Sequence, residues 1–194
     1  LGTEYLSAPL MYSKREIFNT FPEWNGELIR FVAAQDSTII YQMRQDGTGF
    51  KQITVPLKAG EYFDIASQGD AAYYKSNNPI LVAQYGKAVS LLTYCYQGML
   101  LSLIPIKRWC SNSVFYSPNE LDNFIYITFR YEDINNIFFD GTTIASYFGN
   151  QTSIIPGTPF AYITQQIEVG NHYIEGRNGA KFGAYAYGNM DMKN

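Results

Sequence analysis

Few side chains in this sequence could carry out covalent or metal chemistry. The 194 residues include one histidine, His172, and two cysteines, Cys95 and Cys110. A structural zinc site needs four Cys or His ligands, and a hydrolase triad needs a nucleophile, a base and an orienting acid. The sequence carries no nucleophile elbow beside its one histidine. We therefore expect no catalytic residue, no metal site and no cofactor, and we expect the protein not to be an enzyme.

His172 could serve as a general base, but its place in the sequence favours a structural role. Segment 163–173 aligns with segment 53–63, so that Gly170 falls on Gly60 and Ile167 on Leu57. In this alignment His172 corresponds to Tyr62, just after the glycine of a predicted hairpin. We expect the position to be a slot for an aromatic ring.

The acidic residues at predicted hairpin ends, Asp36, Glu132, Asp133 and Asp140, supply oxygen ligands of the kind that Ca²⁺ prefers. No Asp-x-Asp-x-Asp-Gly loop is present, so turn capping is the expected role. Asn150-Gln151-Thr152 is an N-glycosylation sequon in a predicted loop. We predict glycosylation at Asn150 if the chain is secreted.

The two cysteines leave two readings open. In an extracellular protein an even number of cysteines suggests a disulfide, here between Cys95 and Cys110. In an intracellular protein the same residues would be two buried thiols. The residues alone do not decide between them.

The charge and the apolar content of the sequence argue against two kinds of partner, nucleic acid and a lipid bilayer. The chain has 14 Lys and Arg against 17 Asp and Glu, a net charge of −3, which argues against a basic surface for nucleic acid. The most apolar stretch, 99–106, is far shorter than the roughly 20 residues that cross a bilayer. We expect neither nucleic-acid binding nor a membrane span.

The elements that must position these residues are strands. Tyrosine and phenylalanine number 17 and 13, and both favour strands. Short runs of β-branched and aromatic residues recur, with Asp-Gly turns at 46–47 and 140–141. The predicted strands are 27–34, 37–44, 50–57, 61–66, 71–75, 79–85, 124–130, 136–144, 160–167, 171–174 and 182–187. The one weak helical candidate is 14–18.

The fold class predicted from this pattern is all-β, with two tandem, packed β-sandwich-like units of similar design. The alignment of 53–63 with 163–173, together with similar strands before each copy, suggests the two units. We place the first at 1–90, a joining segment with both cysteines at 91–115, and the second at 116–194.

The order of several motifs resembles the N-terminal domain family of the IgGFc-binding proteins, which are large secreted and cell-surface proteins. The matching segments are the opening strand at 2–8, an Ala-x-x-Asp-x-Thr hairpin at 33–39, a Leu-x-x-Gly-Glu turn at 57–62 with 76–85, and a Pro-x-x-x-Trp stretch at 103–109 with 115–118. The acidic-Pro dipeptide that many members have before the tryptophan is absent from 94–99.

The resemblance implies a secreted or cell-surface β domain in a larger extracellular assembly, and it favours the Cys95–Cys110 disulfide. The expected function is a non-catalytic structural or adhesive module that acts through protein contacts, with self-association and glycan binding left open. Two alternatives remain, a lectin-like glycan-binding module and a viral or phage surface protein.

Overall fold

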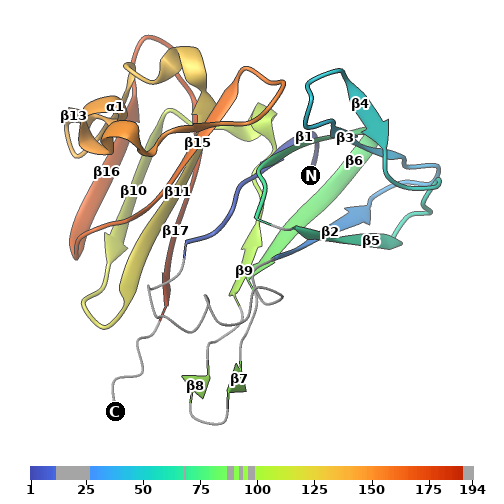
Figure 1. Cartoon of the computed structure of the whole chain (residues 1–194), viewed down its shortest axis with the longest axis horizontal. Helices are drawn as coiled ribbons and strands as arrows, with labels where there is room; N and C mark the ends of the chain where they lie inside the picture. The colour runs from blue at the N-terminus through green and yellow to red at the C-terminus, as the bar shows by residue number, and fades with distance from the viewer. Residues whose placement is uncertain (12–26, 68, 87–89, 92–93, 96–98, 190–194) are drawn as a thin grey trace. The chain divides into compact units, whose positions relative to one another are not determined.

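A computed structural model describes residues 1–11, 27–67, 69–86, 90–91, 94–95 and 99–189 of the chain. The regular structure of these residues is almost entirely β-strand, with one short helix, which confirms the predicted all-β class. They divide into two compact units, the first with strands β1 to β9 and the second with strands β10 to β17 (Figure 1). The division after β9 falls between Lys107 and Arg108. The predicted limits 1–90, 91–115 and 116–194 stay a prediction about domains.

The first unit is organised around one long strand, β6, drawn in green in Figure 1. The strands of this unit are β1 (Gly2–Ser7), β2 (Glu27–Ala33), β3 (Ile40–Met43), β4 (Phe50–Gln52), β5 (Tyr62–Ser67), β6 (Ala72–Gly86), β7 (Ser90–Leu91), β8 (Tyr94–Cys95) and β9 (Met99–Ser102), followed by a 3-10 turn, η3 (Ile106–Arg108). The first part of β6 pairs with β3 and most of β1, and its last part pairs with β2 and β9. The strand therefore joins two half-sheets, β4-β3-β6-β1 and β5-β2-β6-β9.

The middle of β6, between its two paired parts, is held by side chains. The Asn77 side chain accepts from the Ile39 backbone N–H at 2.7 Å and donates to the Ser37 carbonyl at 2.9 Å, and the Asn78 amide donates to the Asp36 carbonyl at 3.1 Å. These bonds tie the middle of the strand to residues 36–39. The prediction of two strands, 71–75 and 79–85, was therefore wrong, because they form one continuous strand.

The inner faces of the two half-sheets form the core of the first unit. Phe31 of β2 and Tyr74 of β6 meet edge to face with ring centroids 4.8 Å apart. Both rings are buried, as are Tyr5, Ile29 and Ile40. The Tyr5 hydroxyl donates to the Ile80 carbonyl at 2.6 Å, which satisfies its polar end inside this core.

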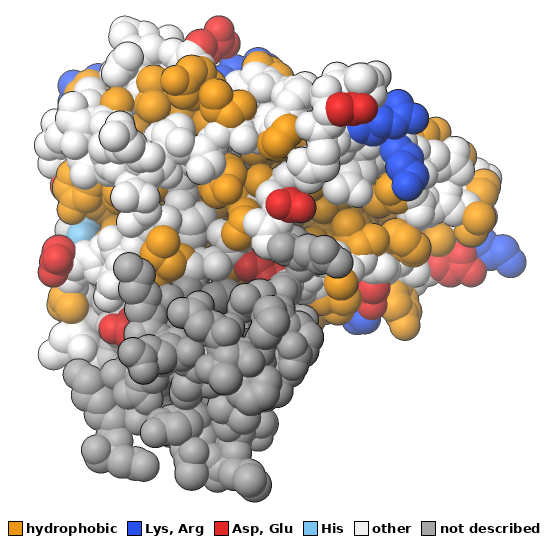
Figure 2. Space-filling model, in the orientation of Figure 1, with side chains coloured by type: hydrophobic (Ala, Val, Ile, Leu, Met, Phe, Trp, Pro, Cys, Tyr) orange, Lys and Arg blue, Asp and Glu red, His pale blue; other side chains and the backbone are white. Residues whose placement is uncertain are grey.

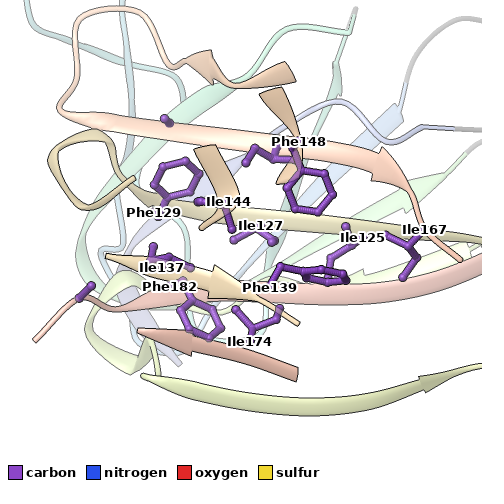
Figure 3. Close-up of a cluster of buried hydrophobic side chains, with 13 residues drawn as sticks. Ile125, Ile127, Phe129, Ile137, Phe139, Ile144, Phe148, Ile167, Ile174 and Phe182 are labelled. Atoms are coloured by element: carbon purple, nitrogen blue, oxygen red, sulfur yellow. The ribbon is translucent and has the colours of Figure 1, made fainter. Parts of the chain in front are cut away.

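The second unit consists of two four-stranded sheets, β10-β16-β12-β13 and β14-β15-β11-β17. Its elements are β10 (Asn112–Ser117), β11 (Asp122–Arg130), η4 (Tyr131–Asp133), β12 (Ile137–Phe139), β13 (Thr142–Thr143), α1 (Ile144–Tyr147), η5 (Gly149–Gln151), β14 (Ser153–Ile154), β15 (Phe160–Gln166), β16 (Gly170–Gly176) and β17 (Phe182–Asn189). The sheets enclose a cluster of buried apolar side chains that includes Ile127, Phe139 and Phe182. Figure 3 shows these side chains packed between the strands.

Most predicted strands lie close to their predicted positions. Strand β4 ends at Gln52, and Leu57 of the same predicted run instead forms an isolated bridge with Thr38. Strands β7, β8, β9, β10 and β14 were not predicted. The predicted helix at 14–18 lies outside the described residues.

The described residues contain no helix that is both long and apolar enough to cross a membrane.

Candidate functional site

The outward side of strand β2 carries the side chains that form the candidate site. The strand alternates strictly: Ile29, Phe31 and Ala33 are buried, whereas Leu28, Arg30 and Val32 are half-buried. Because successive residues of a strand point to opposite faces, these three side chains lie on the face away from the core.

Strand pairing extends this face across the half-sheet. Val32 stands opposite Tyr62 of β5 and Leu81 of β6, and Leu28 stands opposite Tyr85 of β6. Tyr85 in turn stands opposite Leu100 of β9. We call this surface the outer face of the first unit; it comprises Leu28, Arg30, Val32, Tyr62, Asp64, Ala66, Leu81, Ala83, Tyr85, Leu100 and Ser102.

Arg30 lies at the centre of the outer face of the first unit and is fixed on three sides. Its guanidinium makes two hydrogen bonds to the Asp64 carboxylate, Nε to Oδ1 at 2.8 Å and Nη2 to Oδ2 at 2.7 Å. The Tyr62 ring lies 4.3 Å from its central carbon and the Tyr85 ring 5.6 Å away. The hydrogen bonds with Arg30 lower the pKa of the Asp64 carboxyl, and those with Asp64 raise the pKa of Arg30. The pair is therefore charged throughout the physiological pH range.

Several apolar side chains on this face are open to solvent. Tyr62 is 59% exposed, Leu100 55% and Leu81 39%. Charged side chains are sparse in the view of Figure 2, and hydrophobic side chains reach the surface between them. An apolar face of this kind around one ordered arginine is suited to contact with another macromolecule rather than to a chemical reaction.

The second unit also exposes one side of a sheet, formed by β10, β16 and β12. Val114, Tyr116 and Tyr173 are 73%, 63% and 40% exposed. The Tyr173 hydroxyl donates to the Asn112 side chain at 2.8 Å, and Arg177 stacks on Phe138 at 3.8 Å while it pairs with Glu175. This outer face of the second unit is more polar, and it provides a comparison for the first.

His172, the one histidine, is buried in the second unit. It is 5% exposed, and its ring packs against those of Phe115 and Phe139 with centroid distances of 5.2 and 5.1 Å. This confirms the expected aromatic slot. Nδ1 lies 2.7 Å from the Asp140 carboxylate and Nε2 lies 2.9 Å from the Glu168 carbonyl.

The predicted disulfide is not decided by the structure. Cys110 is free and exposed, and its thiol lies 3.8 Å from the Phe182 carbonyl. The side chain of Cys95 lies outside the described residues. The Cys95–Cys110 disulfide stays a prediction.

Asn150 lies in the short turn η5, between α1 and β14, and is exposed. Its exposure leaves room for a glycan, and glycosylation stays a prediction.

Two of the four acidic residues at hairpin ends, Asp36 and Asp140, accept hydrogen bonds from backbone N–H groups. Asp36 accepts from Ala59 at 2.9 Å and Asp140 from Tyr173 at 2.8 Å. In the described part of the chain, no three His, Cys, Asp or Glu side chains lie close enough to hold a metal ion.

A family model described as IgGFc binding protein matches residues 1–188, nearly the whole chain. The chain belongs to this family. The family is one of binding modules that are typically extracellular, and it is not known for enzymatic activity. Comparisons with curated proteins and with solved structures found no match.

The sequence reasoning missed the outer face of the first unit. The signal was the alternation in Glu27–Ala33, where Arg30 occupies an outward position between Leu28 and Val32. A strand with apolar residues on both sides predicts burial on both faces, and only the exposure of Tyr62, Leu81 and Leu100 on the other strands of the sheet shows that one side stays open.

Proposed function

We propose that this chain is a non-catalytic protein-binding module of a larger extracellular assembly, with a structural or adhesive role. We further propose that it contacts its partner through the outer face of the first unit. The observation that carries the proposal is the exposed apolar surface of Tyr62, Leu81 and Leu100 around an arginine that is already ordered.

The composition of this face is typical of the centre of a protein interface. Tyrosine and arginine are enriched among the residues that dominate binding energy. Asp64 and the two tyrosine rings hold the Arg30 side chain in place. Less conformational entropy is therefore lost when a partner packs against it.

Membership of a family named for binding an immunoglobulin fragment supports protein binding as the class of activity. The family description does not identify the partner of this chain. Other protein domains of the same assembly are the proposed partners. A second copy of this chain would be one such protein partner.

Photo-crosslinking tests the proposal. Tyr62→p-benzoylphenylalanine places a photoreactive ring on the outer face of the first unit. Tyr116→p-benzoylphenylalanine is the matched control, because Tyr116 is equally exposed on the outer face of the second unit. Both variants are irradiated in secreted fluid of the source organism. We expect a discrete protein adduct from position 62 only; equal labelling at both positions, or none at 62, would contradict the proposal.

The proposal includes passage through the secretory route. The exposed Asn150 sequon, the two cysteines and the typical location of the family support it. The mass of the intact native protein, before and after reduction and deglycosylation, is the test. A gain of two hydrogens on reduction and loss of a glycan support secretion, whereas an unmodified mass with two free thiols would overturn this part.

A further inference from the structure

Both ring nitrogens of His172 face hydrogen-bond acceptors. Nδ1 lies 2.7 Å from Oδ2 of Asp140, and Nε2 lies 2.9 Å from the Glu168 carbonyl oxygen. Neither oxygen can donate, since one belongs to a carboxylate and the other to a peptide bond. A neutral imidazole has one N–H, whereas the imidazolium has two. Only the protonated ring satisfies both contacts.

The surroundings also favour the positive charge. The ring stacks on Phe139 at an interplanar angle of 29° and is tilted by 33° against Phe115, and aromatic faces attract cations. Burial opposes the charge, but the paired Asp140 carboxylate offsets this cost through a short charge-assisted bond.

The two acceptors come from different turns of the second unit. Asp140 belongs to the turn between β12 and β13, and Glu168 belongs to the turn between β15 and β16. Asp140 also accepts from the Tyr173 backbone N–H at 2.8 Å. His172 thus ties the β12–β13 turn and the turn that leads from β15 into β16 to strand β16.

We propose that His172 is held as an imidazolium and acts as a proton-dependent clamp, which joins these two turns and opens when the proton leaves. Loss of the proton sets the lone pair of one ring nitrogen against an acceptor oxygen. The second unit is then less stable and its two turns are freer to separate.

The titratable groups around the ring determine how the clamp responds to pH. Asp140 faces it from the β12–β13 turn and the Glu168 carbonyl from the β15–β16 turn. Tyr147 of α1 packs on Phe139, which contacts the His172 ring. Burial and the Asp140 and Glu168 carboxylates raise the pKa of the Tyr147 hydroxyl, so this group stays neutral. The clamp therefore holds while the ring keeps its second proton and is lost as the pH rises.

Nuclear magnetic resonance gives a direct test, because His172 is the one histidine in the chain and its ring signals are unambiguous. At pH 7.5, when an ordinary histidine is mostly neutral, we expect both ring nitrogens of the wild-type protein to show the shifts of protonated nitrogen. Asp140→Asn keeps a residue that tolerates the positive φ of 49° at this turn. We expect it to lower the proton affinity of the ring at least about tenfold, since one charge partner is lost.

Glu132→Gln is the control, because Glu132 is an exposed carboxylate in η4 of the same unit. It should leave the titration of His172 unchanged. A wild-type ring with one protonated nitrogen at pH 7.5, or equal titration of the wild-type and Asp140→Asn proteins, would overturn the clamp.

A second measurement separates the clamp from a merely structural ring. The difference in free energy of unfolding between the wild type and His172→Gln should shrink as the pH rises from mildly acidic to alkaline values. A difference that stays constant with pH would show that the ring fills space without acting as a clamp, and would overturn the proposal.

Discussion

Each unit holds a basic side chain against two aromatic rings and a carboxylate, but the surroundings differ. In the first unit Arg30 contacts Tyr62 and Tyr85 and pairs with Asp64 on an open sheet face. In the second unit the almost fully buried His172 contacts Phe115 and Phe139 and pairs with Asp140. The exposed arrangement presents a permanent charge to a partner, whereas the buried one holds two turns together.

The face of the sheet on which each side chain lies explains the difference. Gly60 and Gly170 both adopt positive φ, and Tyr62 and His172 each follow two residues later. Tyr62 stands opposite Val32 on the outward side of its sheet, whereas His172 lies on the same buried side of β16 as Ile174. The same sequence position is therefore open in the first unit and covered in the second.

The largest expected effect is on stability. His172→Ala should lower the free energy of unfolding by roughly 3 kcal/mol, because it removes the ring contact of Asp140 Oδ2 and of the Glu168 carbonyl and opens a cavity beside two rings. Arg30→Ala should cause a clearly smaller loss, because solvent replaces a partly exposed ion pair. Denaturant unfolding of both variants measures the two losses in the free energy of unfolding. Equal losses would contradict the difference between the buried and the partly exposed side chain.

The two turn glycines should differ in how well they tolerate a side chain. Gly170 has φ of 142° and Gly60 has φ of 85°. Alanine can reach the left-handed region near Gly60 at a cost of about 1 kcal/mol, whereas the region near Gly170 is used almost only by glycine. Gly170→Ala should therefore reduce the melting temperature more than Gly60→Ala. The reverse order would show that the two turns are not comparable.

Acid should affect the exposed pair through Asp64. Arg30 lowers the pKa of this carboxyl, so the pair stabilises the folded state above the ordinary carboxyl pKa near 4. The contribution is lost as the pH falls through the lowered value. Arg30→Met should return the Asp64 pKa to its usual range, as followed by carbon NMR of the carboxyl. An unchanged titration would contradict the pairing.

Salt should have the smallest effect. At about 1 M sodium chloride the screening length falls to roughly 3 Å, which weakens exposed pairs more than buried ones. The Arg30→Met variant should then differ less from the wild type in stability than it does at low salt. The loss of stability caused by His172→Ala should change little with salt. Equal salt sensitivity of the losses in the two variants would contradict the difference in burial between Arg30 and His172.

Local patterns were enough to predict most strands and the two turn glycines, because alternation and Asp-Gly turns act over a few residues. Strand β10 was missed because its pattern is inverted: Val114 and Tyr116 face solvent, whereas Ser117 is buried. The Arg30–Asp64 pair joins residues 34 positions apart, and His172 and Asp140 are 32 apart. Such pairs depend on sheet register, which the sequence pattern does not specify.

The affinity of the partner crosslinked at position 62 tests the central claim most directly. Binding of that protein to the wild type, Leu100→Ser and Val114→Ser would be measured by biolayer interferometry. Leu100 and Val114 are exposed apolar residues on the outer faces of the first and second unit. We predict about a tenfold or greater loss of affinity for Leu100→Ser and little change for Val114→Ser. Equal losses, or a loss for Val114→Ser alone, would contradict the assignment of binding to the first unit.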